Sequence, residues 1–213
     1  MSCNIPSDLV RIDSTFEEYE LLQDLKERKL FLMHEIEPLD YENGPDEFLS
    51  TTGRMVRFIC QCNLEDKSLP LKERKPIKIY IDSPGGDIEE GFSLISAIEL
   101  SKTPVYTINI GQWSSMSFLI GIAGHKRFSL PYSTFLLHEG SSFAGGATNK
   151  VQDRVEFEKR VEDEVVKPHV LKNSKMKSTE YDALTRVEYY MLPKDALEQG
   201  FIDEIVSDID TIL

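Results

Sequence analysis

Two periods of apolar spacing alternate through the middle of the chain, one typical of strands and the other of helices. Runs rich in β-branched residues at 77–83 ("IKIYIDS") and 104–111 ("PVYTINIG") predict two buried strands. Residues 87–100 and 115–123 have apolar residues at helical spacing and predict two helices, and "HKRFSL" and "STFLLHE" predict two further strands. This alternation of strands and helices predicts an α/β fold around a mostly parallel sheet.

The flanking parts of the chain are mainly helical by the same criterion. "FEEYELLQDLKERK" and "LSTTGRMVRFICQCNLE" predict helices, with a buried strand in "KLFLMHEI" and a loop at 38–49 between them. After the central part, residues 149–166 predict a long charged helix that Pro168 ends or kinks, and "STEYDALTRVEYYM" predicts a shorter helix. Pro193 and Gly200 bound a last helix before a strand in "FIDEIV".

Size and charge limit the classes of function. A chain of 213 residues, 40% of them hydrophobic, can bury one sizeable core, so we expect a single domain over 1–213 with an N-terminal segment at 1–16. The formal net charge of −13 argues against nucleic acid and anionic membrane as partners. No apolar run is long enough to cross a bilayer, and the first residues lack the pattern of a secretory signal.

Three cysteines in the whole chain do not make a disulfide framework. Cys60 and Cys62 form a C-x-C pair without a second pair, so we expect half-buried thiols there rather than a metal site. Together with the absence of a signal sequence, this predicts a cytoplasmic protein.

Three serines interrupt the apolar stretch "GQWSSMSFLIGIAG", residues 111–124, where a strand gives way to a helix. Either they cap the helix or one of them is a nucleophile. Ser115 would stand at the helix N-terminus, where unpaired N–H groups and the helix dipole favour a developing negative charge. The Gly85-Gly86 turn opens at the same edge of the sheet and can bring a further N–H close, because glycine has no side chain.

A serine nucleophile needs a base and a group that orients the base. His138 ends the strand "STFLLH" at the edge where Ser115 lies, whereas His125 lies at the far end of the second helix. A structural histidine is the alternative for His138. Gly85-Gly86 belongs to neither a G-x-G-x-x-G nor a lysine-bearing P-loop, which argues against phosphate binding.

The stretches "YIDSPGGDIEEGFSLISAI", "GQWSSMSFLIGIAGHKRFSLPYSTFLLHE" and "YYMLPKDALEQGFIDEI" resemble the Clp protease proteolytic subunit, a family of serine peptidases. The resemblance covers roughly residues 17–207 and implies a ClpP/crotonase-like fold of repeated β-β-α units with a protruding handle helix at about 141–170. It implies that Ser115 is the nucleophile, that His138 is the base, and that backbone N–H groups of Gly86 and Met116 form the oxyanion hole.

The third member of the triad departs from the family, which has an aspartate where this chain has Glu188. Glutamate can also hold a histidine tautomer. The alternatives are that Glu188 is a surface carboxylate, or that Asp182 or Asp195 orients the base. We favour Glu188 because it alone has the right offset from the last helix.

Other departures concern assembly. The family usually has an arginine, which joins ion pairs between two stacked rings, at the position of Val187, and a glutamine-proline pair at the position of Glu139-Gly140. The helix at 149–166 resembles the handle that interlocks the rings, and "SSFAGG" resembles the strand that lies against substrate. The segment before residue 17 is unlike the family's axial hairpin, which makes the docking of an unfoldase less secure.

The resemblance implies a serine endopeptidase that hydrolyses unfolded polypeptides inside a chamber of heptameric rings stacked in pairs, fed by an AAA+ ATPase. No metal or cofactor is expected in the peptidase itself. The alternatives are a capsid-maturation peptidase of the same fold, a ring subunit that needs an active paralogue, and a crotonase-type acyl-CoA enzyme.

Overall fold

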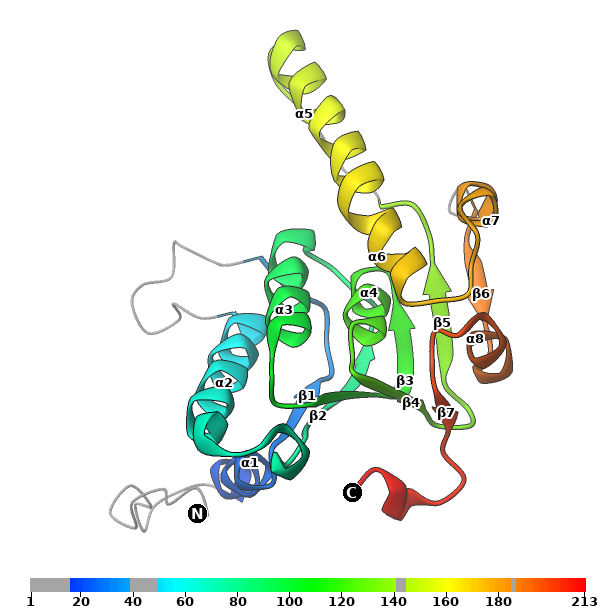
Figure 1. The fold of residues 1–213 in the computed structure, drawn as a ribbon. Coiled ribbons are helices and arrows are strands. Elements are labelled where there is room, and N and C mark those ends of the chain that lie inside the picture. The colour runs from blue at the N-terminus through cyan, green and yellow to red at the C-terminus, as the bar shows by residue number, and fades with distance from the viewer. Residues whose placement is uncertain (1–15, 39–49, 141–144, 185–186) are drawn as a thin grey trace.

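A sheet of seven strands, parallel except at one edge, organises the fold (Figure 1). The computed structural model describes residues 16–38, 50–140, 145–184 and 187–213. Strands β1, β2, β3, β4 and β7 are neighbours in that order, and β5 pairs with the end of β3 that β4 leaves open. The predicted α/β fold is therefore confirmed. The strands are β1 (Lys29–Leu32), β2 (Ile77–Ser83), β3 (Val105–Ser114), β4 (Lys126–Ser129), β5 (Thr134–Leu137), β6 (Tyr189–Met191) and β7 (Glu204–Ile205).

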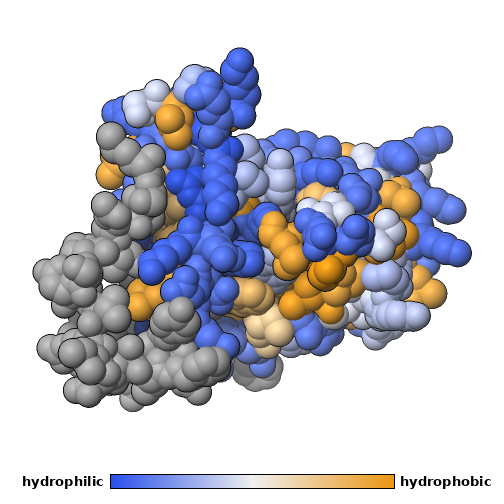
Figure 2. Space-filling view, turned by 90° about the horizontal axis from the view of Figure 1, so that it is seen from below, coloured by the Kyte–Doolittle hydropathy of each residue, from blue (hydrophilic) through white to orange (hydrophobic). Residues whose placement is uncertain are grey.

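The two sides of the sheet are covered unequally. Alternate residues of a strand face opposite sides, and Ile79 and Ile81 of β2 belong to the large apolar core that lies under the helices. Tyr80 points the other way, into a smaller cluster that Ile212 near the C-terminus helps to close. Seen from below, the described surface is mainly hydrophilic around an apolar area (Figure 2).

The helices before the long charged helix follow the predicted order. Helices α2, α3 and α4 pack side by side, and Asp87 caps α3 by accepting a hydrogen bond from the Glu90 N–H at 2.9 Å. On α2 Cys62 is buried and Cys60 is exposed, so the C-x-C pair points in two directions. These elements are α1 (Phe16–Glu27), α2 (Thr51–Glu65), the short 3-10 helices η3 (Asp66–Ser68) and η4 (Leu71–Glu73), α3 (Ile88–Leu100) and α4 (Met116–Ile122).

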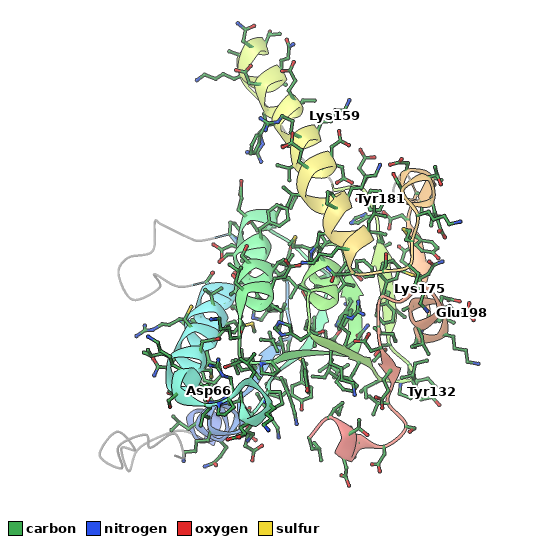
Figure 3. The ribbon with its side chains drawn as sticks, viewed as in Figure 1. Asp66, Tyr132, Lys159, Lys175, Tyr181 and Glu198 are labelled. Atoms are coloured by element: carbon green, nitrogen blue, oxygen red, sulfur yellow. The ribbon has the colours of Figure 1, made fainter. Side chains whose placement is uncertain are left out.

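The link between β1 and the start of η3 is an ion pair. Arg28, at a φ of 60°, donates hydrogen bonds of 2.7 and 2.8 Å to the two carboxylate oxygens of Asp66 (Figure 3). This paired geometry lowers the pKa of the largely buried Asp66 carboxyl. The bridge therefore holds the N-terminal strand against the helical layer.

The long charged helix runs through Pro168 instead of ending there. Helix α5 (Thr148–Val161) projects from the body (Figure 1), and a π-helical turn, η5 (Glu162–Val166), joins it to α6 (Lys167–Lys172). Pro168 lies in the first turn of α6, directly after the π turn. A residue in the first turn of a helix needs no N–H for an intrahelical hydrogen bond, so proline is tolerated there. The expected break is thus a local change of hydrogen-bond register.

The predicted helix over "STEYDALTRVEYYM" is wrong in its second half. Helix α7 covers Ser178–Leu184, and the tyrosines after it form β6, which pairs antiparallel with β5. Aromatic residues favour strands, and the open edge of β5 supplies backbone partners that no local pattern reveals. Helix α8 (Pro193–Gln199) and the 3-10 helix η6 (Ile209–Thr211) complete the chain, with Gly200 at φ 77° ending α8 as predicted.

Some expectations fall outside what the structure describes. The loop predicted at 38–49 lies almost wholly outside the described residues, as do most of the N-terminal segment and of the "SSFAGG" strand. The strand predicted in "KLFLMHEI" is shorter than expected, since β1 ends at Leu32, but Ile36 still bridges to Gly86. Among the helices that the structure describes, none has the length and apolar character needed to cross a membrane.

Candidate active site

Ser115 occupies the sharp turn between β3 and α4. Its backbone lies at φ 55° and ψ −125°, a strained conformation for a residue with a side chain, costing about 1–3 kcal/mol. The turn is held in place because the Ser115 N–H donates to the Leu136 carbonyl at 3.0 Å and the Ser115 carbonyl accepts from Phe118 at 3.0 Å. The half-buried Ser115 side chain does not cap α4, so capping does not explain this serine.

Ser117, in contrast, has a structural place. Its fully buried hydroxyl lies 2.6 Å from the Ser83 carbonyl and accepts a hydrogen bond of 2.8 Å from the Ser114 N–H. Ser83 in turn donates through its own hydroxyl to the His34 carbonyl at 2.6 Å. This chain of serines joins the end of β2 to the turn that carries Ser115. The sequence analysis counted Ser117 among the three serines of this stretch without predicting this bond, and it did not consider Ser83. The available signal was a hydroxyl on the core face of a predicted element.

Gly85 and the Ser115 turn are in direct contact. A Cβ added to Gly85, whose φ is 101°, would lie 2.8 Å from the Ser115 Cβ and 2.9 Å from the Met116 nitrogen. No side chain fits in that space, so only glycine lets the two turns approach this closely. The sequence-based expectation that these turns meet at one sheet edge is confirmed.

The bonds on either side of Gly86 turn its N–H away from Ile36. Ile36 donates to the Gly85 carbonyl and accepts from the Asp87 N–H, both at 2.7 Å, so Ile36 bonds the groups on either side of Gly86. In a parallel pair the backbone groups of the residue between them point to the opposite neighbour, which here is the β3 side. Gly86 is exposed, which is consistent with the oxyanion role expected for its N–H.

Met116 supplies a further N–H at the same place. It is the first residue of α4, and the first N–H groups of a helix have no partner inside the helix. The Met116 side chain is buried against Gly91, where an added Cβ would lie 2.4 Å from the Met116 Cε. Gly86 and Met116 therefore present backbone donors from two turns that touch each other.

His138 and Glu188 face each other because of the register between β5 and β6. Leu137 pairs with Tyr189, so the next pair outward is His138 with Glu188, and the His138 Nδ1 lies 3.0 Å from the Glu188 Oε1. A carboxylate only accepts hydrogen bonds, so Nδ1 carries the proton and Nε2 holds the lone pair. The hydrogen bond with His138 lowers the pKa of Glu188.

The other ring nitrogen of His138 is buried without a partner. Its Nε2 makes no hydrogen bond within the described part of the chain, an uncommon state for a buried polar atom. His138 follows Leu136 by two residues on the same face of β5, and the Leu136 carbonyl is the group that anchors the Ser115 N–H. Among the described residues no hydrogen bond joins this nitrogen to the Ser115 hydroxyl, and the printed link between the two regions is the bond from the Ser115 N–H to the Leu136 carbonyl.

The remaining candidates are engaged elsewhere. Asp182 pairs with Lys167 at 2.5 Å, and Asp195 accepts from the Leu192 N–H at 2.9 Å at the start of α8. His125 accepts from the Val105 N–H at 2.9 Å at the opposite end of β3, as the sequence predicted. The side chain of Val187, at the position where the resemblance implies an arginine, is 55% exposed. Among the described residues, no three His, Cys, Asp or Glu side chains gather as a metal ion would require.

The comparisons with known proteins agree with this geometry. The family model described as Clp protease matches residues 68–208, a span that contains both turns, His138 and Glu188. The chain is similar to the ATP-dependent Clp protease proteolytic subunit of Streptococcus gordonii, with 28% identity over 137 residues, 63% of this chain and 70% of that protein. It is also similar to proteins named ATP-dependent Clp protease proteolytic subunit 2. That of Treponema pallidum is 34% identical over 64% of this chain and 69% of its own length, and that of Treponema denticola is 42% identical over 38% and 42%.

Proposed function

The chain belongs to the Clp protease family and is a serine-type peptidase, and on that premise we propose that Ser115, His138 and Glu188 are its catalytic triad. The observation that carries this proposal is the state of His138. One ring nitrogen lies 3.0 Å from a carboxylate oxygen, and the other is buried without a partner among the described residues. The strand before His138 is tied to the strained Ser115, whose N–H donates to the Leu136 carbonyl. The family match favours this function over a crotonase-type acyl-CoA enzyme.

The reaction that this arrangement supports is acyl transfer. His138 Nε2 takes the hydroxyl proton as Ser115 Oγ attacks the scissile carbonyl carbon, while the Gly86 and Met116 N–H groups hold the oxygen that becomes negative. The imidazolium, stabilised by Glu188, then gives the proton to the leaving amine as the peptide bond breaks. Water, deprotonated by the same nitrogen, hydrolyses the ester and releases Ser115.

The substrate in this proposal is an extended, unfolded polypeptide. A polypeptide that pairs through its backbone with the segment around Gly86 adds a strand to the sheet. Such pairing depends little on the side chains of the substrate. Selection of substrates is then the task of the partner that delivers them. The relatives are named ATP-dependent, which supports an AAA+ ATPase in that role.

Assembly into heptameric rings stacked in pairs is part of the same proposal, with the whole chain as one domain of the particle. Helix α5 supports self-association, because it has no buried residue and exposes Val155 and Phe157 by 54% and 53%. Apolar side chains on a projecting helix are expected to be covered by another copy. Val187 cannot form the ion pair that arginine gives in relatives, so the contact between rings would depend on packing. We place the particle in the cytoplasm, which cell fractionation tests.

A peptidase assay that compares wild type with Ser115→Ala tests the function. Wild type should cleave a short fluorogenic peptide and react with a fluorophosphonate at Ser115, and Ser115→Ala should do neither. Wild type that reacts at Ser115 but cleaves peptides only after a second subunit is added would identify a ring subunit dependent on a paralogue. Wild type that neither cleaves nor reacts in any assembly state would refute the triad.

A further inference from the structure

Tyr190 contacts the oxygen of Glu188 that His138 does not use. The Tyr190 Oη donates to the Glu188 Oε2 at 3.0 Å, while the Oε1 of the same carboxylate faces the His138 Nδ1, also at 3.0 Å. Both oxygens of Glu188 are therefore engaged, each by a different side chain.

The strand register explains how Tyr190 reaches this position. Residues two apart on a strand face the same side, so Tyr190 of β6 lies on the same side as Glu188, which directly precedes this strand. Across the strand pair, Tyr190 stands opposite Leu136, and Glu188 stands opposite His138. The contact therefore follows from the backbone pairing of β5 with β6.

A glutamate at this place needs such support more than an aspartate does. Its side chain has one more rotatable bond and is 53% exposed, so the carboxylate has more orientations to lose when it binds the imidazole. A donor on the second oxygen restricts that freedom. We propose that Tyr190 is a positioning residue for the triad, whose phenol holds the Glu188 carboxylate in the orientation that faces His138. This inference rests on the proposed function.

The charges of the contact are consistent with that role. His138, and after it Tyr190, lower the pKa of Glu188, so the carboxylate stays ionised as an acceptor for both. The hydrogen bond with Glu188 raises the pKa of the Tyr190 phenol, so the donor keeps its proton at neutral pH. His138 and Tyr190 are the two titratable groups of the described residues that act on the Glu188 carboxyl.

Tyr189 offers a matched control on the same strand. It faces the opposite side of β6, where it packs half-buried against the core. Tyr189→Phe and Tyr190→Phe therefore remove the same hydroxyl from neighbouring positions, and only the second removes a partner of Glu188.

The first experiment measures kcat and KM for a short fluorogenic peptide and the rate of fluorophosphonate labelling of Ser115. Tyr190→Phe should lower kcat and the labelling rate by about 3- to 10-fold, the range of one hydrogen bond, with KM unchanged. The acid limb of the kcat/KM profile should move to lower pH, because a less fixed carboxylate stabilises the imidazolium less. Tyr189→Phe should change none of these.

A double-mutant cycle separates positioning from a general surface effect. Glu188→Asp shortens the side chain by one methylene, and we expect its carboxylate to lose the contact with the phenol, so adding Tyr190→Phe to Glu188→Asp should cost nothing further. An equal loss in both backgrounds, or no loss from Tyr190→Phe alone, would overturn the role of Tyr190 while leaving the triad intact. Wild type that is inactive and unlabelled at Ser115 would instead refute the proposed function, and this inference with it.

Discussion

The Nδ1 of His138 lies 3.0 Å from the Oε1 of Glu188, across the one antiparallel strand pair of the described sheet. Backbone pairing sets the two residues opposite each other, so their contact does not depend on the conformation of a long loop. The pairing shows how the glutamate that we propose as the third member of the triad reaches the imidazole. The short strand β6 carries the carboxylate directly to the imidazole, while Tyr190 contacts its other oxygen.

Glu188→Gln should lower kcat by at least about 100-fold with little change in KM. An amide keeps the shape of the side chain but can donate to Nδ1, which favours the wrong tautomer of His138 and does not stabilise the imidazolium. Steady-state kinetics on a fluorogenic peptide measure the effect. Asp182→Asn, which removes an exposed partner of Lys167, is the control and should stay within about twofold of wild type. A comparable loss in both variants would contradict the assignment.

The chain of strands and helices was predictable because each element has a regular apolar period of its own. The positions of Ser115, His138 and Gly86 at one sheet edge follow from that order, since parallel strands end together. The strand β6 was not predictable, because its pairing partner lies some fifty residues earlier and is chosen by tertiary contact. For the same reason local spacing alone could not show that Tyr190 reaches Glu188.

The serine network was hidden from the sequence for a different reason. A buried hydroxyl is recognised only when its partners are known, and the partner of Ser117 is a carbonyl at Ser83, 34 residues away. The π turn before Pro168 was hidden as well, because proline predicts an interruption of the helix but not the form it takes.

Ser117→Ala should lower both stability and kcat. The change leaves the buried Ser114 N–H without its acceptor and the Ser83 carbonyl without its donor, which costs about 1–3 kcal/mol in the free energy of unfolding. The same bonds join the end of β2 to the turn that carries Ser115, so if these turns form the proposed oxyanion hole, kcat should fall more than KM rises. Chemical denaturation and peptide kinetics measure the two effects.

Ser96→Ala is the control for that experiment, since its exposed hydroxyl bonds only within α3, to the Phe92 carbonyl. It should change the free energy of unfolding by less than about 0.5 kcal/mol. Full activity in a destabilised Ser117→Ala protein would separate the network from catalysis and leave it a purely structural role.

Gly86→Ala should strongly lower kcat. The added Cβ would lie 2.2 Å from the Ile36 carbonyl oxygen at a φ of 138°, so the turn must move and take the Gly86 N–H with it. Loss of one oxyanion donor lowers kcat by about 100- to 1,000-fold in other hydrolases. Gly146→Ala is the control for backbone strain without a clash, because the φ of Gly146 is 131° and no atom lies within 4 Å of an added Cβ. If Gly86→Ala kept normal turnover, its N–H could not be an oxyanion donor.

The base of the projecting helix contains a partly buried acid. Glu162, in the π turn, accepts a hydrogen bond from the buried Tyr181 hydroxyl of α7, at the foot of the helix (Figure 3). Burial raises the pKa of Glu162 and outweighs the hydrogen bond from Tyr181, which lowers it. Smaller effects of Glu139 and Asp163 raise the pKa further, and that of Lys167 lowers it. The ionised form of Glu162 is therefore less favourable in the folded protein than in the unfolded chain.

Glu162→Gln should stabilise the protein at neutral pH and leave it unchanged in acid. A raised folded pKa means that stability is fully present below the ordinary value of 4.5 and is lost as pH rises through the folded pKa. The variant, which cannot ionise, should keep that stability, so its Tm should exceed that of wild type at pH 7 and approach it near pH 4. Glu164→Gln is the control with the opposite sign, because Arg160 lowers the pKa of Glu164, and it should not raise Tm at pH 7. If Glu162→Gln lowered Tm at pH 7, the charged hydrogen bond with Tyr181 would outweigh the cost of burying the carboxylate.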